Sequence, residues 1–276
     1  MGSQTSKVER PTPVKGKTLP PEIIEEILDY LVVNSDFRSL RSCSLASRSW
    51  HPSCRRRLYH TTTFTTWGMA KWLKIFPVPG ESPAHLVKDL RLSVGEYWNA
   101  PRGFFEHTSW FANVQKMTLQ GPGMFQCGGI PPSARLPESV TSLAIYSEEI
   151  TLRQIRNVMA QLPNLDDLSI SGALVEVGGS TPREMGTALR GRFGGQLQLL
   201  FGRDDTDVMD MLLGIPTGLH FTEVHIHANY ECLLSTVRFA EACSRTLVKL
   251  TYEVSTYGKY LPTGPSSTRS VDTEAI

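Results

Sequence analysis

The chain has 276 residues, 40% of them hydrophobic and 20% charged, which excludes a disordered or fibrous protein. Its formal net charge of +1 excludes recruitment of nucleic acid by the field of the whole molecule. No stretch approaches the roughly 18 consecutive apolar residues that a membrane-spanning helix needs. The five cysteines are odd in number and follow no signal peptide, so we expect reduced thiols in an intracellular protein of the cytoplasm, the nucleus or both.

Residues 1–17 are polar and lack periodicity, so we expect a disordered tail. The opening MGSQTSK matches the pattern for N-myristoylation, with Gly2 as the acylated residue. The alternative is an ordinary polar tail or a cloning remnant. Because one acyl chain binds a membrane only weakly, we expect membrane contact only if Gly2 is acylated.

Three short helices are predicted next, within about forty residues. The first lies in LPPEIIEEILDYLV, where prolines suit the first turn and apolar residues recur at helical spacing: Ile23, Ile24, Ile27, Leu28 and Leu31. Asn34 to Asp36 end it and offer a cap for a second helix through Phe37, Leu40 and Cys43. A third is expected to start near Ala46 or Ser47, with one apolar side formed by Trp50, Cys54 and Leu58. Because so small a unit cannot bury all of its own apolar surface, we expect it to pack against another surface.

A fourth helix is predicted over residues 66–76, with Leu73 and Phe76 on its apolar side beside Ala70 or Trp72. From residue 86 onward, a short pattern of alternating leucine-like residues recurs, with first members Leu90, Met117, Leu143, Leu168, Leu197, Val224 and Leu250. The steps of 27, 26, 25, 29, 27 and 26 residues are typical of a leucine-rich-repeat solenoid. We therefore predict an α/β fold with a curved parallel sheet of about seven strands.

Helical segments are expected between several of these strands. Thr151 and Gln154 form a capping-box pair before one apolar stripe, and two further stripes begin at Val208 and Leu233. Glycine- and proline-rich loops are expected at 121–133 and around 177–186. No repeat follows the last strand, near residues 247–254, so we expect this strand to lack a cap.

Several groups of residues invite a chemical interpretation that their spacing does not favour. Cys43, His51, Cys54 and His60 fit no zinc-ligand spacing, and core packing explains the cysteines better. The run Arg55–Arg57 lacks interleaved aromatic residues, which favours a solvated helix face over nucleic-acid binding.

Glu223, His225 and His227 share one strand face and could hold a divalent metal, but outward residues of a repeat are the simpler interpretation. No phosphate-binding glycine motif or nucleophile elbow occurs. We expect neither an enzyme nor a bound metal or cofactor.

The segment 18–62 resembles an F-box. The residues that carry the resemblance are Leu19-Pro20-Pro21-Glu22-Ile23, Ile27-Leu28, Leu31, Leu40 to Leu45 (LRSCSL), and Arg48-Ser49-Trp50. The rest is similar to leucine-rich-repeat F-box proteins of basidiomycete fungi, in CSRTLVKLTYEV and LRGRFGGQLQL. The resemblance implies docking on the Skp adaptor of a cullin–RING (SCF-type) ubiquitin ligase. It implies adaptor-binding residues Leu19, Pro20, Ile23, Ile24, Ile27, Leu31 and Leu40, and packing residues Leu28, Cys43 and Trp50.

The repeats would then bind a protein substrate through the outward residues of the strands. The candidate residues are Arg91, Lys116, Tyr146, Asp167, Gln198, Glu223, His225, His227 and Lys249. This mixed polar surface suits a protein and not nucleic acid. The expected organisation is a tail (1–17), an F-box (18–62), a leucine-rich-repeat-like domain (63–262) and a second tail (263–276). The alternatives are an interaction scaffold that reaches no cullin, and a metal-binding or enzymatic repeat protein.

Overall fold

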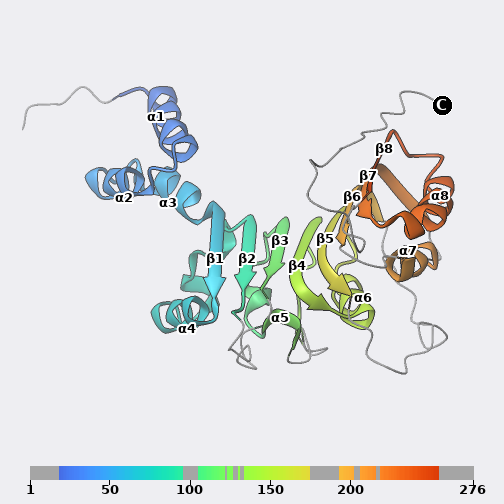
Figure 1. The fold of residues 1–276 in the computed structure, drawn as a ribbon. Helices are drawn as coiled ribbons and strands as arrows, with labels where there is room; N and C mark the ends of the chain where they lie inside the picture. The colour runs from blue at the N-terminus through green and yellow to red at the C-terminus, as the bar shows by residue number, and fades with distance from the viewer. Residues whose placement is uncertain are drawn as a thin grey trace, which may run out of the picture. The chain divides into compact units, whose positions relative to one another are not determined.

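The structure is a computed structural model that describes residues 19–95, 105–121, 123–126, 130, 134–174, 193–201, 206–215 and 218–254. All structural statements below concern these residues. The chain divides into two compact units, Met1–Leu58 and Tyr59–Ile276, and each is described by itself (Figure 1). The two expected tails, Gly2 and the loop at 177–186 lie outside the described residues.

The first unit contains the three predicted helices, α1 (Pro21–Val33), α2 (Phe37–Ala46) and α3 (His51–His60). The Asp36 side chain caps α2 by accepting a hydrogen bond of 3.0 Å from the Ser39 amide. The prediction that α3 starts at Ala46 or Ser47 is wrong. Ser47 is extended and its hydroxyl bonds that of Ser49, so a turn delays α3 to His51.

A small apolar cluster holds these helices together. Leu28, Leu40 and Cys54 are fully buried at its centre, one from each helix. The side chains that pack around them are partly buried: Ile24, Leu31, Val32, Cys43, Trp50 and Leu58. A core of this size supplies little hydrophobic stabilisation, so polar contacts between the helices carry unusual weight here.

The second unit is built on a parallel sheet whose strands are neighbours in chain order. Within the described residues it has eight strands, one more than predicted: β1 (Thr61–Thr65), β2 (Asp89–Ser93), β3 (Lys116–Gln120), β4 (Ser142–Ile150), β5 (Asp167–Leu174), β6 (Phe193–Phe201), β7 (Leu219–Ala228) and β8 (Lys249–Val254). The predicted parallel pairing is confirmed. All seven first members of the sequence pattern lie on one register line, from Leu90 through Leu168 to Leu250.

The additional strand, β1, has the sequence TTTFT and carries a single buried apolar side chain, Phe64. Thr62 occupies the register position of Leu90, so the leucine-based pattern cannot detect this strand. Its signal is instead the run of β-branched threonines, which favours a strand.

The helices α4 (Thr66–Ile75), α5 (Gly123–Gln126), α6 (Leu152–Met159), α7 (Thr206–Leu213) and α8 (Leu233–Ala242) lie along one side of the sheet (Figure 1). The predicted capping box of α6 is present, with Thr151 and Gln154 bonded reciprocally. α5 lies in the stretch 121–133 that was expected to be a loop. In α4 the buried side chains are Met69 and Trp72, whereas Ala70 is exposed.

The apolar side chains at the two ends of this sheet differ in how deeply they are buried. At β1, Trp72 of α4 packs edge-on against Phe64 with a ring-centre distance of 5.2 Å, and Phe111 lies 6.1 Å from Trp72. At β8, Leu250 and Tyr252 remain only half-buried, although the equivalent positions on the inner strands are buried. Among the described residues, the apolar layer therefore has an aromatic cover at β1 and is less deeply buried at β8.

Two glycines stand where neighbouring strands come closest. Gly121 follows β3 with φ of +106°, and a Cβ there would collide with the carbonyl oxygen of Val94. Gly172 has the same relation to the carbonyl of Ser147. An L side chain at either place would strain the backbone and push two strands apart.

The substitution Gly121→Ala is therefore expected to lower the free energy of unfolding by more than about 2 kcal/mol. The matched control is Gly80→Ala, because no atom lies within 4 Å of a Cβ at that position. We expect the control to stay within about 0.5 kcal/mol of wild type in chemical denaturation. Equal stability of the two variants would contradict the close approach at Gly121.

Candidate functional site

The first candidate surface is an exposed apolar stripe on α1. Leu19, Ile23, Ile27 and Tyr30 recur every three or four residues and are 47%, 42%, 37% and 69% exposed. The opposite apolar stripe of the helix, centred on Leu28, faces the core. A helix with apolar residues on both sides serves its own core with one side and leaves the other for a partner.

The residues predicted to bind the adaptor fall into three environments. Leu19, Pro20, Ile23 and Ile27 are exposed. Ile24 and Leu31 are half-buried against the cluster of the first unit. Leu40 is fully buried, so the structure places it in the interior and not on a surface that a partner can contact. Tyr30 was not among the predicted residues, although its position three residues after Ile27 is a detectable signal.

The residues predicted to pack the unit lie at its interior. Leu28 is fully buried, and the half-buried Cys43 and Trp50 pack on the same cluster. Their apolar spacing in the sequence was sufficient to place them there.

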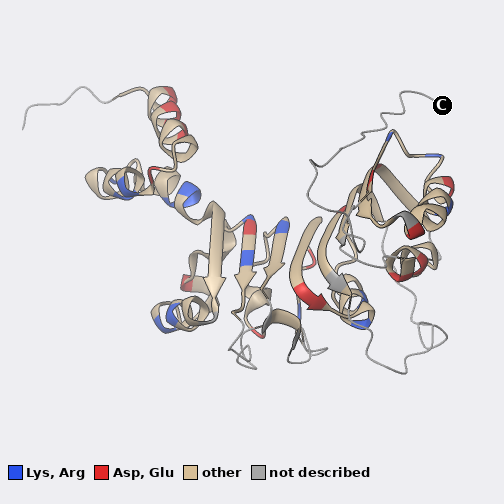
Figure 2. Ribbon diagram, in the orientation of Figure 1, with Lys and Arg blue, Asp and Glu red and all other residues tan. Residues whose placement is uncertain are grey.

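The arginines of α3 were interpreted as a solvated face, and for Arg57 this is wrong. Its guanidinium lies 2.7 Å from the Glu25 carboxylate and 2.7 Å from that of Asp29, and its side chain is only 15% exposed. Ser53 donates a hydrogen bond of 2.6 Å to Glu25. These contacts join acidic residues of α1 to a basic residue of α3. Figure 2 shows the red segments of α1 and the blue segment of α3. No local pattern signals these contacts, because the partners lie about thirty residues apart in the sequence.

The hydrogen bond from Ser53, followed by the contact with Arg57, lowers the pKa of Glu25. A carboxyl whose pKa is lowered in the folded state stabilises that state above its unfolded pKa. This stabilisation is lost as the pH falls through the lowered pKa.

We therefore expect Arg57→Met to destabilise the protein by about 1 kcal/mol at neutral pH, because two carboxylates lose their shared partner. The difference from wild type should shrink as the pH falls below the usual carboxyl range, when Glu25 becomes protonated in both proteins. Arg56→Met is the control, since Arg56 is exposed. Urea denaturation at pH 7 and pH 3 measures both effects, and a difference independent of pH would contradict the assignment.

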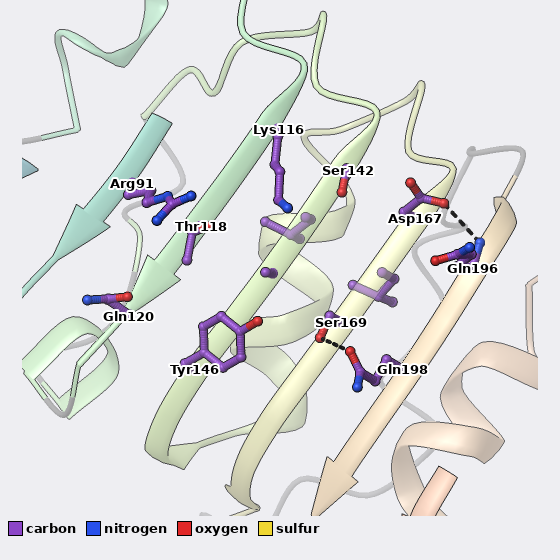
Figure 3. A pocket seen from close by; sticks show the side chains of 13 residues that line it. Arg91, Lys116, Thr118, Gln120, Ser142, Tyr146, Asp167, Ser169, Gln196 and Gln198 are labelled. Carbon is purple, nitrogen blue, oxygen red and sulfur yellow. Dashed lines mark hydrogen bonds between the residues drawn. The ribbon is translucent and has the colours of Figure 1, made fainter. Parts of the chain in front are cut away.

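The second candidate surface is the polar face of the sheet, on the side away from the apolar layer. Its centre is a hollow of about 400 Å³ (Figure 3). Strands β2 to β6 line it, chiefly with Arg91, Lys116, Thr118, Gln120, Ser142, Tyr146, Asp167, Ser169, Gln196 and Gln198. Five of the nine predicted face residues, Arg91, Lys116, Tyr146, Asp167 and Gln198, therefore line one hollow.

Some charged side chains of this hollow are already bonded within the protein and others are not. Arg91 is bonded to Asp89 at 2.8 Å, and this contact raises the pKa of its guanidinium. The Asp167 carboxylate accepts a hydrogen bond of 2.9 Å from the backbone N–H of Gln196. Lys116 is exposed and forms no ion pair among the described residues, and Tyr146 is 43% exposed. Lys116 and Tyr146 are therefore available to an incoming group.

The remaining predicted face residues lie further along the sheet. Glu223, His225 and Lys249 line a second hollow of about 210 Å³. His225 Nε2 lies 3.5 Å from the Glu253 carboxylate, and His227 occupies the next polar row. Thr118 and Ala144 lie in the first hollow, between the rows of Lys116 and Gln120, although each is only 6% exposed.

The cysteines and histidines form no metal centre in the part of the chain that the structure describes. No group of three or more His, Cys, Asp or Glu side chains lies close enough there to hold an ion. Burial, with a smaller contribution from Cys43, raises the pKa of the Cys54 thiol, and burial raises that of Cys243 to about 11. Both thiols are thus protonated at neutral pH and are poor metal ligands or nucleophiles. Among the described helices, none is both long and apolar enough to cross a membrane.

Comparison with known proteins identifies the class of the first unit. Residues 17–65 match the family model of F-box-like domains. The chain thus carries an F-box-like domain, a class whose members mediate protein–protein interaction, typically as adaptors of SCF ubiquitin ligases. No curated protein and no solved structure matches the chain.

Proposed function

We propose that this protein is the substrate-recognition adaptor of an SCF-type cullin–RING ubiquitin ligase. The observation that carries the proposal is the F-box-like domain with an apolar stripe of α1 left exposed. Burial of apolar area at about 25 cal/mol per Å² makes Leu19, Ile23 and Ile27 effective contacts for the Skp adaptor. In this proposal the F-box-like protein described here is itself non-catalytic and acts inside the cell.

The second unit is proposed to be a leucine-rich-repeat receptor for the substrate. The near-constant strand spacing, the single register line and the helices along one side support this architecture. The polar hollow around Lys116 and Tyr146 is broad, carries both signs of charge and is rich in amide and hydroxyl groups. These properties suit a protein segment better than a nucleic acid, which demands a uniformly basic surface.

The adaptor contact is tested by binding to the purified Skp adaptor in calorimetry. We expect Ile23→Ala combined with Ile27→Ala to weaken binding at least tenfold, because two apolar side chains lose their burial. Leu45→Ala is the matched control, since Leu45 is 87% exposed but lies on α2 and not on the stripe of α1. A wild-type protein that fails to bind the adaptor would refute the ligase role and favour a scaffold that reaches no cullin.

The substrate face is tested by proximity labelling in cells with the full chain. We expect Lys116→Glu combined with Tyr146→Ala to lose a subset of labelled proteins while the Skp adaptor stays labelled. Arg153→Glu, an exposed charge reversal on α6, should retain that subset. An unchanged set of labelled proteins in the double variant would show that the substrate binds elsewhere.

A further inference from the structure

The hollow around Lys116 and Tyr146 runs across the strands and not along them. Its lining comes from the five strands β2 to β6 but from only three rows of residues. Residues of the middle row are register neighbours: Arg91, Thr118, Ala144, Ser169 and Gln198. The centre of this row consists of small side chains, with larger ones in the rows on either side (Figure 3). A ligand that fills the hollow must therefore cross several strands.

One side of the hollow carries opposite charges at a fixed separation. Lys116, Ser142 and Asp167 are register neighbours on β3, β4 and β5. The two charged residues thus lie two strand spacings, or about 10 Å, apart. Neither of them forms an ion pair among the described residues. The bond from the backbone of Gln196 to Asp167 uses the Oδ1 atom and leaves Oδ2 outside it, so both charges can meet a ligand.

The positive charge of Lys116 is not cancelled by its neighbour on β2. Asp89 is the register neighbour of Lys116, but its carboxylate is bonded to Arg91 at 2.8 Å and is only 12% exposed. The charges of Asp89 and Arg91 balance each other, which leaves Lys116 as the net charge at this end of the hollow. The hollow is therefore positive at β3 and negative at β5.

The other side and the floor of the hollow offer groups that a peptide can use. Tyr146 is 43% exposed and lies beside Gln120 in the third row. Ser169 donates a hydrogen bond of 3.3 Å to Oε1 of Gln198, and the Nε2 hydrogens of Gln198 lie outside this bond. An exposed tyrosine ring packs against apolar side chains, whereas side-chain amides and hydroxyls bond to backbone groups. A peptide presents both kinds of group.

The separation of the two charges selects the conformation of a bound peptide. In a β-strand, side chains on one side are about 6.7 Å or about 13 Å apart, and neither distance matches the pair Lys116 and Asp167. In a polyproline II segment, every third side chain points to the same side, and residues i and i+3 are about 9 Å apart. This conformation makes no internal hydrogen bonds, so its backbone can bond to the polar groups of the hollow.

We infer that this hollow recognises a polyproline II-like peptide segment with an acidic and a basic side chain three positions apart. The acidic side chain meets Lys116, the basic one meets Asp167, and a residue between them packs on Tyr146. A nucleic acid or a uniformly acidic segment would satisfy Lys116 but would be repelled by Asp167. The inference names the substrate class of the proposed receptor face and rests on that proposed function, but it uses only the second unit.

The test is selection from a random dodecapeptide library on the immobilised full chain. Wild type should enrich peptides with opposite charges three residues apart, and Lys116→Glu should enrich peptides with two basic residues at that spacing. Asp167→Asn keeps an oxygen for the backbone N–H of Gln196, so it should retain the acidic preference and lose the basic one. Lys71→Glu is the control, because it makes the same charge change at an exposed position of α4. It should select the same peptides as wild type.

Fluorescence anisotropy with the best wild-type peptide measures the strength of the charge pairing. Lys116→Glu should weaken binding at least about fivefold, and a lysine in place of the peptide's acidic residue should restore binding to that variant to within about twofold. The inference is overturned if wild type selects no peptide, if the charges are not three residues apart, or if both hollow variants select the wild-type peptides. Binding to the Skp adaptor is measured separately, so the ligase role can fail while the charge-dependent selection holds, and the reverse.

Discussion

The second unit depends on the line of apolar side chains that crosses its sheet at Leu90, Met117, Leu143, Leu168, Leu197, Val224 and Leu250. Because a shift of one residue would turn every strand over, this line fixes the register of each strand against the next. The register in turn aligns the polar residues in rows on the opposite face. The hollow around Lys116 and Tyr146 is therefore a consequence of core packing, with residues of five strands brought together although they lie more than a hundred positions apart.

The apolar cluster of the first unit is small and supplies little hydrophobic stabilisation. Polar contacts between α1 and α3 add to it: Arg57 bonds the carboxylates of Glu25 and Asp29, and Ser53 donates a hydrogen bond to Glu25. These contacts fix the side of α1 that lies away from its exposed stripe. Leu19, Ile23 and Ile27 can then remain available to a partner without becoming part of the interior. The charges of α3, which resemble a nucleic-acid patch in the sequence, thus support a surface for protein binding.

The polar face and the two ends of the described sheet follow from one architectural feature, the repetition of a strand. Repetition aligns polar side chains in rows on one face, and it leaves β1 and β8 as the outermost strands of the described sheet. At β1 the chain covers that end of the apolar layer with Trp72 and Phe64. At β8, Leu250 and Tyr252 are half-buried.

The sequence by itself determined the periodic elements. Apolar spacing placed Leu28 in the core, the capping box started α6, and the leucine pattern predicted seven of the eight strands, because these signals are local and repeat at the period of the element. Only the tertiary structure decided the burial of Leu40, the pairing of Arg57 with α1 and the burial of Thr118 and Ala144. Each of these depends on side chains distant in sequence that become neighbours only after packing. β1 was missed for a related reason: its threonines are held in the sheet by β2, and not by an apolar pattern of their own.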